Sequence, residues 1–181
     1  MRPDRVRSLV LVLGILVPTS PLLAADGDLD TSFSEDGKTT LAWGFTAEAT
    51  SVAPLDDGSL LVGGSAKAAS TAPWDFAVAK YLADGTLDTG WGVSGKRSVT
   101  GTHAGPTEER LLEIVANSSG SAVLLGTTAA QGQENFRRPF LARLTAGGDL
   151  DPTFGDGGTA VGDDNPYLID TFSATRHLDG Y

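Results

Sequence analysis

Three aspartates alternate near the start of the chain, where their oxygens could gather around a calcium ion. Asp26, Asp28 and Asp30 occupy every second position of the stretch DGDLDTSFSEDGK. A calcium loop of the EF-hand type needs glycine at its sixth position and glutamate at its twelfth, where this chain has Thr31 and Gly37. We therefore expect a scaffold loop in which a short carboxylate caps its own turn, with no metal and no cofactor.

Residue types that carry out catalysis are present, but their spacing forms no catalytic constellation. His103 and His177 lie far apart and outside any paired metal-binding spacing. Glu108 and Glu109 are adjacent, so on a strand their side chains point to opposite faces and make a poor acid–base pair. The sequence has no cysteine, no GxSxG nucleophile elbow and no Walker-type phosphate loop. It therefore predicts no catalytic residue and does not favour an enzyme.

Acidic residues and tryptophans narrow the choice of partner. Without residues 1–25 the chain has 22 acidic and 10 basic groups, and a surface of this sign repels phosphate backbones, so nucleic acid is not expected. Trp43 and Trp74 have no counterpart in the second repeat unit, and aromatic faces of this kind stack on sugars or peptides. The partners that stay open are an unknown protein or carbohydrate ligand, or further copies of the chain through exposed blades.

The first 25 residues have the layout of a secretory signal peptide. Arg2, Arg5 and Arg7 precede an apolar stretch over 9–17 that is too short to span a membrane, and small residues follow it. We expect cleavage near Ala24 or Ala25, a secreted or periplasmic protein, and no membrane insertion after cleavage.

A pattern of Leu-Asp, an aromatic residue and a glycine occurs three times, with offsets of 58 and 63 residues. The repeated positions are Leu29, Asp30, Phe33 and Gly37; Leu87, Asp88, Trp91 and Gly95; and Leu150, Asp151, Phe154 and Gly158. We expect each aspartate to cap its loop and each aromatic ring to pin that loop into the core. A nearly fixed period of this kind is typical of repeat architectures.

Four short stretches between these loops read as strands in each unit, because they alternate in polarity or are rich in β-branched residues. The expected strands are 38–45, 47–55, 59–67 and 74–82 in the first unit, and 96–103, 110–118, 121–129 and 138–145 in the second. Tight turns, DDGS and SSGS, join the second and third strands. The sequence predicts an all-β fold of β-propeller-like blades, each with four antiparallel strands.

The element DGxLDxxFGxxG, followed by DGxxxxxG and a strand similar to dFAxARY, resembles the delta-60 repeat family. The resemblance covers nearly the whole chain after residue 25, with Ser34 in place of the first-loop glycine and Gly147 in place of an aspartate. It implies an exported bacterial protein with propeller-like repeats of just under 60 residues. The family is defined by its repeat, so the resemblance implies no particular reaction.

Two blades are expected to be complete and a third truncated, so that the propeller is open. The expected units are 26–95, the first loop and blade; 96–158, the second blade and its loop; and 159–181, the first half of a third blade. An interrupted reading frame of a longer propeller is favoured over a short form that assembles with its own copies and over an open stacked domain. We expect a binding or scaffold module; the alternative is part of an extracellular hydrolase whose site requires additional blades.

Overall fold

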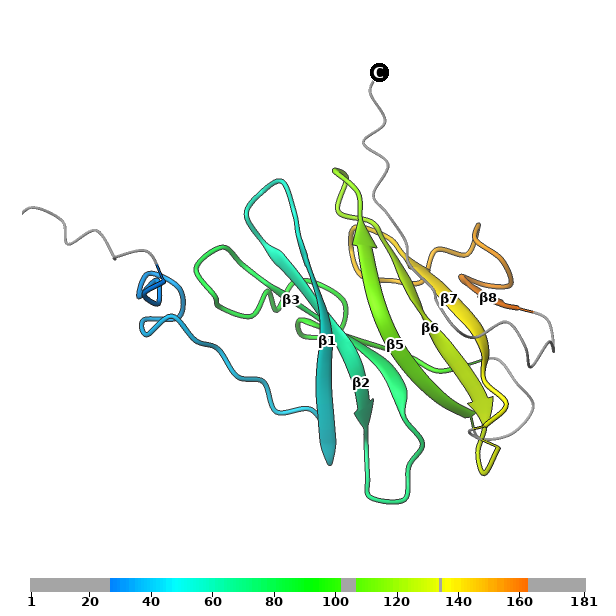
Figure 1. Ribbon diagram of the computed structural model, residues 1–181. Helices are drawn as coiled ribbons and strands as arrows, with labels where there is room; N and C mark the ends of the chain where they lie inside the picture. The colour runs from blue at the N-terminus through cyan, green and yellow to red at the C-terminus, as the bar shows by residue number, and fades with distance from the viewer. Residues whose placement is uncertain (1–26, 102–106, 134, 163–181) are drawn as a thin grey trace, which may run out of the picture.

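The computed structural model describes residues 27–101, 107–133 and 135–162, which are drawn in colour in Figure 1. The predicted signal peptide, His103, His177 and most of the expected third blade lie outside these residues. Within the described part of the chain, no helix is long and apolar enough to cross a membrane.

Two four-stranded antiparallel sheets form the described chain, and each takes its strands in sequence order (Figure 1). The first sheet consists of β1 (Thr46–Pro54), β2 (Leu60–Lys67), β3 (Asp75–Tyr81) and β4 (Lys96–Val99). The second consists of β5 (Thr107–Ala116), β6 (Ala122–Ala130), β7 (Arg138–Leu144) and β8 (Thr159–Val161). The two sheets do not close into a ring, and the predicted all-β fold of open, four-stranded antiparallel blades is confirmed.

The grouping of strands differs from the sequence prediction at the sheet edges. We expected 38–45 to be the first strand of the first unit, but β1 begins only at Thr46 and no residue of 38–45 belongs to a strand. The corresponding stretch of the second unit contains β4, which we expected in the second blade. Instead, β4 pairs with β3 of the first sheet, with Ala79 opposite Lys96. In the same way, β8 pairs with β7. Each sheet thus takes its fourth strand from the start of the next sequence unit, because the loop turns the chain back antiparallel.

A glycine in the second strand of each sheet is required by close backbone approach. The first strand of each sheet carries an irregularity in its register with the second strand. A Cβ atom on Gly64 would lie 1.8 Å from the Glu48 carbonyl oxygen, and one on Gly126 would lie 2.1 Å from the Arg110 carbonyl oxygen. These contacts explain why the repeated strand motif contains glycine at this position.

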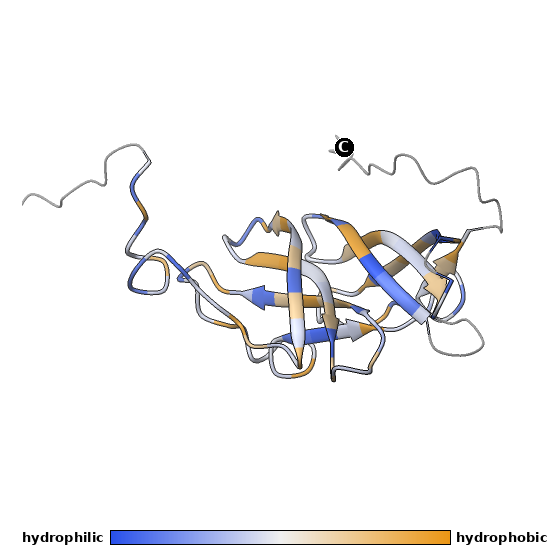
Figure 2. Ribbon diagram, turned by 60° about the horizontal axis from the view of Figure 1, so that its bottom comes forward, coloured by the Kyte–Doolittle hydropathy of each residue, from blue (hydrophilic) through white to orange (hydrophobic). Residues whose placement is uncertain are grey.

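The hydrophobic core lies between the two sheets. Fully buried side chains from both sheets form it, among them Leu61, Phe76, Val78, Leu124, Phe140 and Leu144. The rings of Phe76 and Phe140 meet across the interface with their centroids 5.0 Å apart. Figure 2 shows hydrophobic and hydrophilic stretches alternating along the strands, as expected where one face of a strand packs on its neighbour.

The repeated loops contact one another from one unit to the next. A Cβ atom on Gly148, in the last loop, would lie 2.5 Å from the Trp91 ring of the preceding loop. The N-terminal loop repeats this arrangement, because a Cβ atom on Gly85 would lie 3.0 Å from the Phe33 ring. A backbone hydrogen bond joins the two loops in both cases. The aromatic residue of each loop therefore rests on a glycine of the next.

Gly148→Ala is expected to lower the free energy of unfolding by about 2–3 kcal/mol, because alanine disfavours a positive φ and its Cβ atom overlaps the Trp91 ring. Gly132→Ala is the matched control, since Gly132 has a φ of +83° but nothing within 4 Å of an added Cβ atom. Urea unfolding measures both losses. Equal losses for the two variants would contradict the proposed contact between the loops.

Candidate functional site

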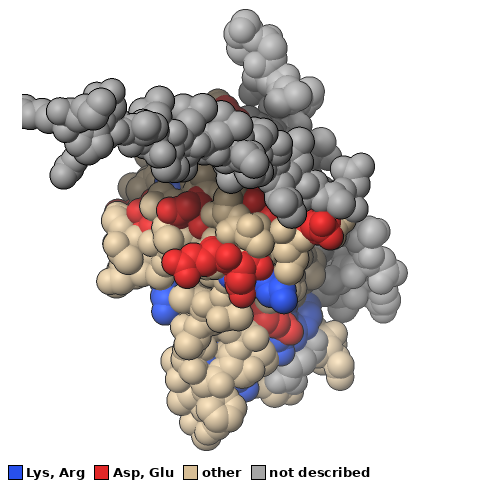
Figure 3. Space-filling model, turned by 90° about the vertical axis from the view of Figure 1, so that its left-hand side faces the viewer, with Lys and Arg blue, Asp and Glu red and all other residues tan. Residues whose placement is uncertain are grey.

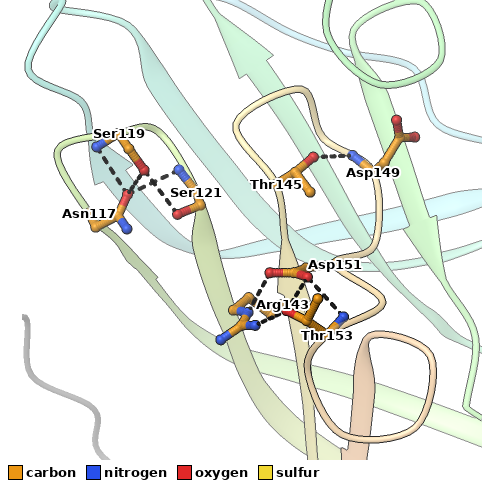
Figure 4. Close-up of polar contacts among 8 residues, drawn as sticks. All are labelled: Asn117, Ser119, Ser121, Arg143, Thr145, Asp149, Asp151 and Thr153. Carbon is orange, nitrogen blue, oxygen red and sulfur yellow. Dashed lines mark hydrogen bonds and ion pairs between the residues drawn. The ribbon is translucent and has the colours of Figure 1, made fainter.

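A set of polar contacts joins the third strand of each sheet to the loop that follows it. In the second sheet, Arg143 Nε lies 2.8 Å from Asp151 Oδ2 (Figure 4). The Arg143 N–H donates to the Gly158 carbonyl at 2.9 Å, and the Asp151 N–H donates to the Arg143 carbonyl at 2.8 Å. The loop thus holds one strand residue by its N–H, its C=O and its side chain.

The first sheet contains the same joint with lysine in place of arginine. Lys80 Nζ lies 3.1 Å from Asp88 Oδ2. The Lys80 N–H donates to the Gly95 carbonyl at 3.1 Å, and the Asp88 N–H donates to the Lys80 carbonyl at 2.9 Å. Two independent copies of the repeat therefore place a basic strand residue against the loop aspartate.

Each loop aspartate also caps its own turn, as expected from the sequence. Asp151 Oδ1 accepts a hydrogen bond from the Thr153 hydroxyl at 2.7 Å and one from the Thr153 N–H at 3.0 Å (Figure 4). These hydrogen bonds, the hydroxyl first, lower the pKa of Asp151, and Arg143 lowers it further. The carboxylate therefore serves two purposes: one oxygen shapes the loop, and the other binds the cation on the strand.

The N-terminal loop has the same internal geometry without a strand beside it. Asp30 Oδ1 accepts hydrogen bonds from the Ser32 hydroxyl at 2.6 Å and the Ser32 N–H at 2.9 Å, and these bonds lower the pKa of Asp30. A Cβ atom on Gly37 would lie 2.7 Å from Leu29 Cβ, close to the 2.8 Å of the last loop. Among the described residues, however, no basic side chain forms an ion pair with Asp30.

An apolar groove of about 480 Å³ lies between the segment that follows this loop and the first sheet. The segment lines it with Thr39, Thr40, Leu41 and Trp43, and the first sheet lines it with residues that include Ala47, Val62, Ala77, Ala79 and Tyr81. Alternation along β3 places Ala77 and Ala79 on the face opposite to Phe76 and Val78, which pack on the second sheet. The groove therefore lies on the outer face of the first sheet.

The outer face of the first sheet corresponds, in the repeat, to the face of the second sheet that packs on the first sheet. When the two loops are aligned at Gly85 and Gly148, the groove residues of β3 match three residues of β7 in order: Ala77, Ala79 and Tyr81 match Phe140, Ala142 and Leu144. All three are 0 % exposed and belong to the core between the sheets. The same face of the repeat is thus covered by a neighbouring sheet in one copy and lines a groove in the other.

Of the two tryptophans without a repeat counterpart, one lines the groove. Trp43 is half-buried there, with Lys96 Nζ 5.4 Å from its ring centroid. Trp74 instead stacks on Arg110, whose guanidinium carbon lies 3.8 Å from its ring centroid. Trp91, expected to be a core residue, is 3 % exposed. Trp43 is therefore the described tryptophan that a ligand in the groove would contact.

Acidic side chains meet at one end of the interface between the sheets. Glu109 is 0 % exposed; its Oε1 accepts a hydrogen bond from the Thr128 hydroxyl at 2.9 Å, and its Oε2 has no hydrogen-bond partner in the part of the chain described. Burial, and then the charge of Asp75, raises the pKa of Glu109. Burial also raises the pKa of Asp75, to which Glu108 contributes.

Sequence reasoning missed this cluster, because it compared Glu109 only with its neighbour Glu108. The available signal was the position of Glu109, two residues before the core residue Leu111 on the same strand. Over 27–101, 107–133 and 135–162, no group of three or more histidine, aspartate or glutamate side chains could hold a metal ion.

Glu109→Gln is expected to change the dependence of stability on pH. The pKa of Glu109 in the folded state lies above its ordinary value of 4.5, so the folded state binds the proton more tightly. The free energy of unfolding of the wild type therefore falls as pH rises from about 4.5 through the folded-state pKa. The variant loses this part of the fall, so it is more stable than the wild type at neutral pH but not below the ordinary pKa.

Thermal melts of both proteins across this pH range measure the effect. Glu35→Gln is the control, because Glu35 is exposed in the N-terminal loop. If Glu109→Gln loses stability with rising pH as steeply as the wild type, burial does not hold the Glu109 proton.

A comparison with known families extends this description. Residues 55–90 and 118–154 match the model of a domain of unknown function, DUF5122, described as a beta-propeller. Each matched segment contains the second and third strands of one sheet and most of the loop after them. No curated protein matches the chain. The chain is therefore similar to the DUF5122 β-propeller domain over these two segments, one in each sheet.

Proposed function

We propose that the chain is an exported β-propeller module of the delta-60 repeat type, which acts as a binding or scaffold protein by docking another polypeptide. The proposed docking surface is the outer face of the first sheet together with the groove beside Trp43. Export is proposed from the signal-peptide layout of residues 1–25, and the repeat type from the three loop motifs.

One observation carries the proposal: the same face of the repeat packs on a sheet in one copy and lines an open groove in the other. In the second sheet this face consists of Phe140, Ala142 and Leu144, which are fully buried against the first sheet. In the first sheet the counterparts Ala77, Ala79 and Tyr81 line an apolar groove of about 480 Å³. Because polypeptide covers the counterpart surface, polypeptide is the class of ligand that this face favours over carbohydrate.

An extracellular hydrolase whose site requires additional blades is the second candidate. The observation that favours it is the buried Glu109 with the half-buried Asp75 nearby, because a carboxyl group with a raised pKa suits a general acid. Glu109 is 0 % exposed, so a substrate does not reach its carboxyl group in this arrangement. The open groove supports a binding role more directly than the cluster supports catalysis.

The apolar dye anilinonaphthalene sulfonate is a probe for the groove, because it fluoresces on apolar protein surfaces. Ala47→Glu places a carboxylate at an exposed position of the groove wall and is expected to weaken dye binding about tenfold, since the charge must stay solvated. Val93→Glu is the matched control, because it adds the same charge at a 68 % exposed apolar residue outside the groove. Equal dye affinity of the two variants would contradict the proposed binding surface.

A further inference from the structure

We infer that the N-terminal loop and residues 38–41 form an acceptor for an extended peptide strand that carries a lysine or arginine. The inference rests on the proposed function and names the ligand of the same surface: a basic strand of the kind seen in β3 and β7. It is drawn from a comparison of three copies of one loop, two of which already hold such a strand.

The two occupied copies define what the acceptor binds. Around Lys80 and Arg143, the loop contributes a carboxylate oxygen, a backbone N–H from the same aspartate and the carbonyl of its last glycine. The corresponding groups of the N-terminal loop are the Asp30 carboxylate, the Asp30 N–H and the Gly37 carbonyl. None of these three groups bonds to a strand within the described residues. The loop is nevertheless already shaped, because Ser32 hydrogen bonds fix Asp30.

The exposure of Leu29 is a second sign that a neighbour is missing. Leu29 is 50 % exposed, whereas its counterparts Leu87 and Leu150 are partly buried beside their strands. Leu87 and Leu150 also form isolated bridges with Tyr81 and Leu144, the last residues of β3 and β7. A strand bound to the N-terminal loop would cover Leu29 in the same way.

Residues 38–41 are the backbone edge along which the peptide would pair. They correspond to Lys96–Val99, which is β4, and they are positioned beside the first sheet by the contact of Phe33 with Gly85. β4 pairs antiparallel with β3, whereas 38–41 has no ladder partner among the described residues. An unpaired edge of this kind binds an extended peptide by main-chain hydrogen bonds, and pockets for alternate side chains select its sequence.

The groove sets the side chains that the peptide must carry. In β3 and β7 the residue two positions before the basic one is apolar, Val78 and Leu141 respectively. Alternation puts it on the same strand face as the basic residue. In the first sheet that face packs on the second sheet. In the acceptor the corresponding face would lie over the groove, so we expect an apolar residue, one spacer and then Lys or Arg.

Charge on this side of the molecule also favours a basic strand. Figure 3 looks onto the side that carries the N-terminal loop and shows acidic side chains gathered in a band across it, with fewer basic ones. Asp30 has a lowered pKa, so its carboxylate is ionised over the range in which lysine and arginine are charged. Pairing along the strand edge sets the register of the peptide, and the negative potential on this side of the molecule disfavours acidic peptides.

The test uses the full chain and a fluorescein-labelled synthetic peptide with the sequence of residues 137–145, RRPFLARLT. Binding is followed by fluorescence anisotropy. We expect saturable binding that the peptide change Arg143→Glu weakens about tenfold more than Arg138→Glu, because Arg143 lies on the strand face that meets the aspartate and Arg138 lies on the opposite face. The two altered peptides have the same composition, so general attraction to an acidic protein cannot separate them.

The matching protein variants are Asp30→Asn and Glu35→Gln, which each remove one negative charge from the same loop. Asn keeps an oxygen for the Ser32 hydrogen bonds, so the loop stays shaped. We expect only Asp30→Asn to weaken binding of the unaltered peptide, and Asp30→Lys to bind the Arg143→Glu peptide better than the wild type does.

Equal affinities for the two altered peptides, or equal effects of Asp30→Asn and Glu35→Gln, would overturn the inference. A stable dimer that excludes the peptide would also overturn it, because a second copy would then cover the acceptor. In the case of failure, dye binding to the groove separates the two proposals: a groove that still binds the dye leaves the proposed function standing without a basic-strand ligand.

Discussion

The arrangement of this protein depends on the contact between one basic strand residue and the aspartate of the loop that follows it. Because the loop binds the N–H, the C=O and the side chain of Lys80 or Arg143, the end of the third strand and the start of its loop have a fixed geometry. The chain then returns antiparallel and forms the fourth strand. The same geometry places Trp91 on Gly148 of the next loop, which sets the spacing between units.

An exposed ion pair alone would contribute little to stability, and these pairs are only partly buried. Their value lies in the combination with two backbone hydrogen bonds, since the three interactions together select one register and a basic side chain. The N-terminal loop keeps the aspartate, the glycine and the aromatic contact but has no strand of its own among the described residues. The repeat therefore explains the packed interface between the two sheets. It also explains why the N-terminal loop carries polar groups that bond to no strand among the described residues.

Much of the fold could be predicted from the sequence because the repeat is visible in it. The recurrence of Asp30, Asp88 and Asp151 between a leucine and an aromatic residue indicated capped scaffold loops, and the hydrogen bonds of these aspartates have that form. The prediction that β4 belongs to the second blade was wrong, because periodicity identifies a strand but not the strand with which it pairs.

The polar joints and the groove were harder to predict. Lys80 and Arg143 look like ordinary solvent-facing strand residues until the loop brings an aspartate beside them. Glu109 reads as one of two adjacent acids, and only the packing of the sheets shows that it is buried near Asp75. The groove arises from the position of 38–43 beside the outer sheet face, which depends on the contact of Phe33 with Gly85.

Amide hydrogen exchange of residues 38–41, measured with and without the RRPFLARLT peptide, is the most direct test of strand addition at the N-terminal loop. The account predicts that the peptide slows exchange at alternate amides of 38–41, in the pattern that β4 shows from its pairing with β3. Peptide binding that leaves exchange over 38–41 unchanged, while Lys96–Val99 stays protected, would contradict it.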